Sequence, residues 1–181
     1  MPTLPQLIEE DIRRLDQILK ELLASSEATT ALIIDKGGFL ITHKSSPRGV
    51  SDSPTAGAAD PATPRGEAQE FDLTTIAALA SGAYLANQTI ANLVREDNFN
   101  SVYQQGQNYS MFASNIDEHC LLVVIFKASI SVGAVKYYAI SAGARVAEQL
   151  KIAHQRDPNA GLDLSVLNLT DSSGLFRKKE A

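Results

Sequence analysis

Residues 72–95 read DLTTIAALASGAYLANQTIANLVR. From Leu73 to Val94 this segment contains no charged side chain, and its length suits one long helix. Asp72 can accept hydrogen bonds from the free backbone N–H groups that begin such a helix, and the polar run Glu96-Asp97-Asn98 ends it. We therefore predict a helix from about Leu73 to Arg95, around which the rest of the fold is arranged.

This predicted helix is apolar on more than one side. One stripe at helical spacing is expected to face the core and contains Ile76, Leu79, Ala80, Ala83, Ile90, Leu93 and Val94. A second face has small or uncharged residues where surface helices usually display lysine and glutamate: Ala78, Ser81, Gly82, Leu85, Ala86 and Thr89. In water the second face would form a continuous apolar patch. We expect another subunit or partner to cover it, with twofold pairing as the default; the alternative is a helix buried inside a monomer.

The same segment is long enough to cross a bilayer. Its apolar content is mostly alanine, however, and it contains several threonine, asparagine and glutamine side chains, so membrane insertion would be poorly driven. The N-terminus lacks the basic region and apolar core of an export signal. We therefore expect a soluble, cytoplasmic protein.

Upstream of this helix, the pattern predicts another helix and a hairpin. Apolar residues recur every three or four positions from Leu7 to Leu23, with acids early, which indicates an amphipathic helix. Two β-rich runs, Thr30–Asp35 and Phe39–Lys44, flank Lys36-Gly37-Gly38. Because glycine accepts the positive φ that tight turns need, these runs are predicted to form a hairpin.

Downstream, turn residues separate three predicted strands, over 100–105, 109–114 and 119–127. The run Leu121-Leu-Val-Val-Ile-Phe126 is apolar without alternation, so its strand should be central and covered on both faces. Ser129 or Ser131 then opens a closing helix that continues to about Gln155. The order helix, two strands, helix, three strands, helix predicts an α+β fold: a five-stranded, mostly antiparallel sheet sandwiched by helices.

We expect a single domain over residues 1–156. Residues 45–70 are rich in proline and glycine and contain no aromatic residue, so we predict a disordered insert within that domain. Residues 157–181 are predicted to form a flexible C-terminal tail with a weak apolar patch, which comprises Leu162, Leu164, Val166, Leu167 and Leu169.

Charge and cysteine content exclude several classes of function. The chain has 16 basic and 21 acidic residues and a net charge of -5, and its basic residues are scattered, so nucleic acid is not an expected partner. The only cysteine, Cys120, lies in an apolar run and has no partner for an intrachain disulfide. We expect a buried, unreactive thiol there.

Nothing in the sequence is typical of an enzyme. His43, His119 and His154 have no other ligand at metal-binding spacing, and nucleophile-elbow, P-loop and dinucleotide motifs are missing, so no metal or cofactor is expected. The pairs Glu9-Glu10 and Asp117-Glu118 fall at a helix start and a turn, where solvated carboxylates are common. Arg95 could act as an arginine finger in a partner's nucleotide site, but an arginine at a helix C-terminus more commonly interacts with the helix dipole. We expect a binding module without a catalytic residue.

Three segments in this order resemble the Roadblock family, and in particular its bacterial MglB-type members. They are DLTTIAALASGAYLA at 72–86, REDNF at 95–99, and LLVVIF followed by SVGAVK between 121 and 136. The likeness covers about residues 7–45 and 70–155. It implies a five-stranded Roadblock fold that forms a homodimer by pairing the third strands and packing the second helices together.

The resemblance also implies a function, regulation of a small Ras-like GTPase. MglB-type dimers bind one GTP-loaded GTPase and promote hydrolysis without donating a catalytic residue. The matching surface here would centre on Ala78, Gly82, Leu85, Ala86 and Thr89. We therefore expect a homodimeric GTPase regulator in cell polarity or motility signalling. The sequence departs from the family pattern in the insert at 45–70, in the run Lys127–Ser131, and in the bulk of Leu85 and Thr89.

Two other interpretations stay open. A scaffold or adaptor would bind a GTPase or another protein without altering turnover, and the leucine-containing tail and proline-rich insert suit linear-motif docking. A small-molecule sensor of PAS or GAF type would share a helix-covered antiparallel sheet and would require a ligand pocket.

Overall fold

The computed structural model describes residues 5–46 and 71–156. The predicted insert at 45–70, apart from Ser45 and Ser46, lies outside the described residues. The predicted tail at 157–181, with its apolar patch, lies outside them as well.

Every predicted helix and strand is present, in the predicted order. The elements are α1 (Glu9–Ser26), β1 (Thr30–Asp35), β2 (Leu40–Ser45), α2 (Leu73–Leu93), β3 (Ser101–Gln105), β4 (Tyr109–Asn115), β5 (Cys120–Lys127) and α3 (Val132–Gln155). Of the two serines proposed to open the last helix, Ser131 is the N-cap residue of α3.

The strands form one five-stranded sheet in the order β2-β1-β5-β4-β3. All neighbouring strands in it run antiparallel. The apolar strand β5 is central and buried from Cys120 to Phe126, as its unalternating sequence predicts. The two edges of the sheet are β2 and β3. The predicted α+β fold is therefore confirmed.

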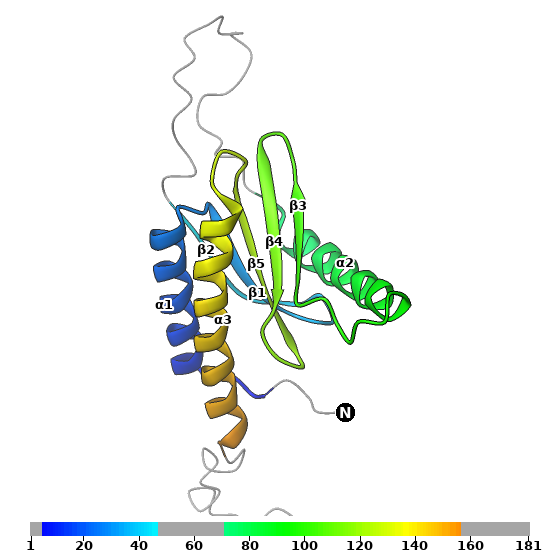
Figure 1. The fold of residues 1–181 in the computed structure, drawn as a ribbon. Coiled ribbons are helices and arrows are strands. Elements are labelled where there is room, and N and C mark those ends of the chain that lie inside the picture. The colour runs from blue at the N-terminus through cyan, green and yellow to red at the C-terminus, as the bar shows by residue number, and fades with distance from the viewer. Residues whose placement is uncertain (1–4, 47–70, 157–181) are drawn as a thin grey trace, which may run out of the picture.

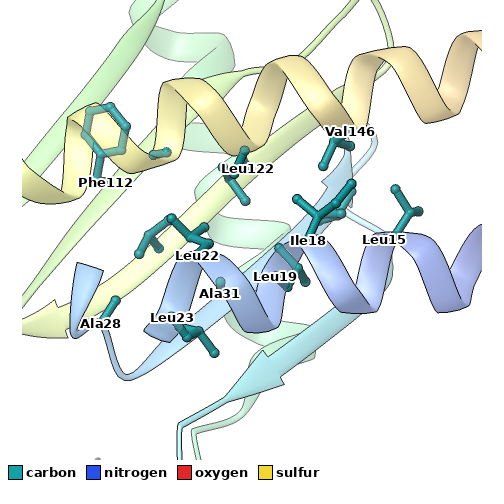
Figure 2. Packing of buried hydrophobic residues seen from close by; sticks show 14 of the residues in the cluster. Leu15, Ile18, Leu19, Leu22, Leu23, Ala28, Ala31, Phe112, Leu122 and Val146 are labelled. Atoms are coloured by element: carbon teal, nitrogen blue, oxygen red, sulfur yellow. The ribbon is translucent and has the colours of Figure 1, made fainter. Parts of the chain in front are cut away.

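Helices cover both faces of this sheet, but unequally. In Figure 1, α1 and α3 lie side by side on one face, and α2 lies alone on the other. Alternate side chains of β5 enter the two layers: Leu122 and Val124 pack with α1 and α3, whereas Leu121 and Val123 pack with α2. Figure 2 shows the larger layer, in which residues from Leu15 to Leu23 meet Leu122 and Val146.

The turn between β1 and β2 fixes the position of α2 against the sheet. Gly38 adopts a φ of 91°, which confirms the positive φ expected for this glycine pair. A Cβ added to Gly38 would lie 2.9 Å from the Cα of Ala78, so only glycine allows the turn to approach the α2 backbone this closely. The Ser81 hydroxyl also donates a hydrogen bond to the Lys36 carbonyl at 2.5 Å.

Candidate protein-docking surface

The ends of α2 are fixed by local hydrogen bonds. The Asp72 carboxylate accepts bonds from the Thr75 backbone N–H at 3.1 Å and from the Thr75 hydroxyl at 2.6 Å, so the predicted cap is confirmed. At the other end, Arg95 has a left-handed φ of 64°, and the Glu96 N–H donates to the Ala91 carbonyl at 2.9 Å. This pattern is the Schellman motif, which normally has glycine at the left-handed position.

The side of α2 that faces the sheet is not the predicted one. Of the stripe expected in the core, only Ala80 is fully buried, and Leu79 and Leu93 are 68% and 79% exposed. The helix instead packs through small side chains and one tyrosine, namely Ala77, Ala80, Ser81, Tyr84 and Ala91. At 100° per residue, this buried stripe is rotated by roughly 100° from the predicted one.

The size of the side chains explains why α2 presents this side to the sheet. Small side chains let the helix backbone approach the sheet and the Gly38 turn closely, whereas leucine and isoleucine at these positions would hold it away. Tyr84 fills the remaining space and its hydroxyl accepts a hydrogen bond from the Asn98 amide at 3.1 Å. Beneath the helix, the Lys36 ammonium lies 6.0 Å from the centroid of the Tyr84 ring, and burial lowers the pKa of Lys36.

The five residues predicted to form the docking face all lie on the exposed side of α2: Ala78, Gly82, Leu85, Ala86 and Thr89. Ser81, which the sequence also assigned to that face, is buried. Four large aliphatic residues that the sequence placed in the core are exposed, namely Leu79, Ile90, Leu93 and Val94, and the first three join this side of the helix. We call these eight exposed residues the α2 outward surface. It contains no charged side chain over about four turns of helix.

An unpaired strand edge lies on the same half of the molecule. β3 is hydrogen-bonded only to β4 within the sheet, so its other edge presents backbone groups that no described strand pairs. α2 contacts β3 as well as the central strands. A partner protein could therefore contact the apolar side of α2 and the outer edge of β3 at the same time.

The carboxylates that the sequence offered as candidate acids or bases take part in ion pairs and turns. Glu9 pairs with Arg13 and Glu10 with Arg14 on the exposed side of α1. Asp117 accepts hydrogen bonds from the backbone N–H groups of His119 and Cys120 in the turn before β5.

The sequence predicts an unreactive thiol at Cys120 and no metal site at the histidines. Cys120 is buried as predicted, and this burial raises the pKa of its thiol to about 12. In the described ranges, histidine, cysteine and carboxylate side chains form no group of three that could hold a metal ion. None of the described helices combines the length and apolarity needed to cross a bilayer.

The five-stranded antiparallel sheet, with two helices on one face and one on the other, is the Roadblock fold. A Roadblock/LC7 domain from Streptomyces avermitilis superposes with a TM-score of 0.56 at 16% identity, covering 75% of this chain and 97% of that domain. No family model and no curated protein matches the sequence.

Within this fold, MglB structures are similar over more of the chain. An MglB with a tetrameric arrangement gives a TM-score of 0.68 at 25% identity, covering 84% of this chain and 99% of that one. The gliding protein MglB from Thermus thermophilus gives 0.67 at 26% identity, with the same coverage. The resemblance inferred from the sequence is thus confirmed in three dimensions.

Proposed function

We propose that this protein is a homodimeric, cytoplasmic regulator of a small Ras-like GTPase, acting in cell polarity or motility signalling. In this proposal it binds the GTP-loaded GTPase through the α2 outward surface and stimulates hydrolysis without contributing a catalytic residue. The similarity to MglB, one example of which is a gliding protein, supports the functional context.

The observation that carries the proposal is the apolar, uncharged α2 outward surface. Leu79 and Leu93 are mostly exposed, and Ile90 and Leu85 are 48% and 45% exposed. Fully burying one such side chain is worth about 1.5–3 kcal/mol, so covering several of them is a substantial driving force for association. A contiguous patch of this kind marks an interaction site in soluble proteins.

Dimerisation through β3 would use the free strand edge and one flank of α2. Two β3 edges related by a twofold axis can exchange backbone hydrogen bonds and extend the sheet across the dimer. The two α2 helices then lie next to one another. The exposed small residues, Ala78, Gly82 and Ala86, allow close approach of a helix or of a partner's backbone.

The composition of this surface supports stimulation without a catalytic residue. Its eight residues include no acid, base or cation, so their side chains offer no general base and no positive charge for the transition state of phosphoryl transfer. A surface of this kind can act by binding one arrangement of the GTPase switch loops more tightly than the other, which shifts their population. The GTPase's own residues would then perform the chemistry.

The test uses a Ras-like GTPase from the same organism, loaded with GTP or GDP. We expect a complex with the GTP form on size-exclusion chromatography and a faster release of phosphate. Ala86→Arg, Leu85→Arg and Thr89→Arg should abolish both effects, because a buried unpaired charge opposes binding. Ala144→Arg is the matched control, since Ala144 is also an exposed alanine on a long helix, on the opposite face of the sheet. Equal binding by the arginine variants on α2 and by wild type would place the docking surface elsewhere.

Arg95→Ala separates the arginine-finger alternative from this mechanism. Arg95 is exposed at the end of α2, beside the outward surface. We expect this variant to keep the full stimulation of hydrolysis. A loss of stimulation with intact binding would assign a catalytic role to Arg95. A wild-type complex with an unchanged hydrolysis rate would instead select the scaffold alternative.

A further inference from the structure

A cavity of about 760 Å³ lies where the C-terminal turn of α1 meets the ends of β2 and β5. None of its described lining residues comes from α2, so it is separate from the α2 outward surface. Its floor is apolar, because Leu23 and Ala28 belong to the buried layer between the sheet and α1. Figure 2 shows these two residues together at the end of α1.

Lysines from three elements line this cavity: Lys20 of α1, Lys44 of β2 and Lys127 of β5. The Lys44 ammonium is neutralised by the Asp16 carboxylate at 2.6 Å. Lys20 and Lys127 form no ion pair with any residue that the structure describes. Two lysines without a close ion pair among the described residues therefore lie at one cavity, although Lys20 also interacts at longer range with the Asp16 carboxylate.

Thr29 and Glu27 also line the cavity. Thr29 contributes a hydroxyl that donates to the Ile125 carbonyl at 2.8 Å, so it is already satisfied without a ligand. Glu27, the acid among the described lining residues, is exposed at the left-handed C-cap of α1. Glu27 and the carbonyl end of α1 both favour placing a negative group away from the last turn of α1, toward Lys127 and Lys20.

We propose that this cavity binds a small amphipathic anion, with an apolar body on the floor of Leu23 and Ala28 and a carboxylate, sulfonate or phosphate near Lys127 and Lys20. The volume lies within the range of roughly 300–1,000 Å³ that is typical of small-molecule sites. An apolar lining with a few polar groups that fix orientation is also typical of such sites. The ligand is a free amphiphile in solution, and binding does not depend on the proposed GTPase function.

The probe is 8-anilino-1-naphthalenesulfonate, compared with N-phenyl-1-naphthylamine, which has the same rings without the sulfonate. The full-length chain is titrated with each probe and fluorescence is measured. We expect saturable binding of the sulfonate, at least tenfold tighter than binding of the neutral analogue, and displacement of the sulfonate by decanoate below its micelle concentration. Equal affinity for the two probes, or displacement only by anionic lipid vesicles, would overturn the proposal.

The double variant Lys20→Met/Lys127→Met keeps the aliphatic bulk and removes both charges. We expect it to weaken binding of the sulfonate at least tenfold and to leave binding of the neutral analogue unchanged. The matched control is Lys136→Met/Lys151→Met, which removes two exposed charges from α3, outside the cavity lining. Because the α2 outward surface can also bind such dyes, Leu85→Arg is included and should leave the lysine-dependent binding intact. Equal weakening in the two lysine double variants would show that only the net charge matters, and the site would be wrong.

Discussion

The carboxylate of Asp11 fastens the start of α1 to the end of α3. It accepts two hydrogen bonds from the Arg156 guanidinium, at 2.7 and 2.9 Å, and one from the Gln149 amide at 2.8 Å. It also accepts the Ile8 backbone N–H at 2.9 Å, which satisfies a free donor at the helix start. The hydrogen bonds from Arg156 lower the pKa of Asp11 from 3.8 to about 2, although burial of the carboxylate opposes this shift.

Asp11→Asn should destabilise the protein in a pH-dependent way. The folded pKa lies below the unfolded value, so the charged carboxylate contributes its full stabilisation above about pH 4 and loses it as the pH falls toward 2. At pH 7 the contribution is roughly 2 kcal/mol, because one pKa unit corresponds to about 1.4 kcal/mol. We expect urea unfolding at pH 7 to show a loss of this order, and the difference between variant and wild type to shrink at pH 3.

Glu9→Gln is the control for this prediction. Glu9 forms a 2.7 Å ion pair with Arg13, but both side chains are highly exposed. Exposed pairs of this kind contribute about 0–1 kcal/mol. A loss for Asp11→Asn as small as that for Glu9→Gln, or one equal at pH 7 and pH 3, would contradict the buried role of Asp11.

The sequence predicted every helix and strand of the fold but missed the orientation of α2. Helix α1 alternates apolar and charged positions, so its buried side could be predicted, and Leu15, Leu19 and Leu22 are buried as expected. Helix α2 has no charged residue between Leu73 and Val94, so no polar side shows which way the helix is turned. The spacing of the bulky residues predicted that one side of α2 faces the sheet, but close packing against Gly38 turns a different side toward it.

The five predicted docking residues nevertheless lie on the exposed side. These five residues were predicted from the absence of charge and from their mostly small side chains. That prediction holds whichever side of α2 the leucines occupy. Leu79, Ile90 and Leu93 could not be added from the sequence, because a leucine at helical spacing is more commonly a core residue. Their exposure extends the candidate surface beyond the small residues.

Charge substitutions on α2 should separate its two sides. Leu79→Arg puts a charge at a position that is mostly exposed in the single chain, so the fold should persist while the proposed dimer dissociates. Ala77→Arg puts the same charge at a fully buried position, where it lacks both space and a partner, and should prevent folding. Circular dichroism measures the fold, and light scattering measures the mass. A Leu79→Arg protein that stays dimeric would exclude this flank from the subunit interface.

The two helical layers that cover the sheet are unequal. Among the described residues, α1 and α3 share one face of the sheet and α2 alone covers the other (Figure 1). Within the same residues no strand pairs the outer edge of β3, and the exterior of α2 is apolar. Edge strands and apolar patches are liabilities that proteins usually cover or charge. Here the α2 outward surface is uncharged, and a second copy related by a twofold axis would cover the β3 edge together with one flank of α2, which leaves the rest of that surface to the proposed GTPase.

Thermal stability should therefore depend on protein concentration. When unfolding is coupled to dissociation, mass action makes the dimer more resistant to heat as concentration rises. Between 1 and 100 µM, the unfolding free energy per dimer rises by about 2.7 kcal/mol, which corresponds to about 5 °C in Tm for a dimer of this size. Calorimetry across this range measures the shift, and Leu79→Arg should remove it and unfold at the same temperature at every concentration. A wild-type Tm that stays constant over the range, with a monomeric mass, would mean that each chain is stable with α2 exposed to water.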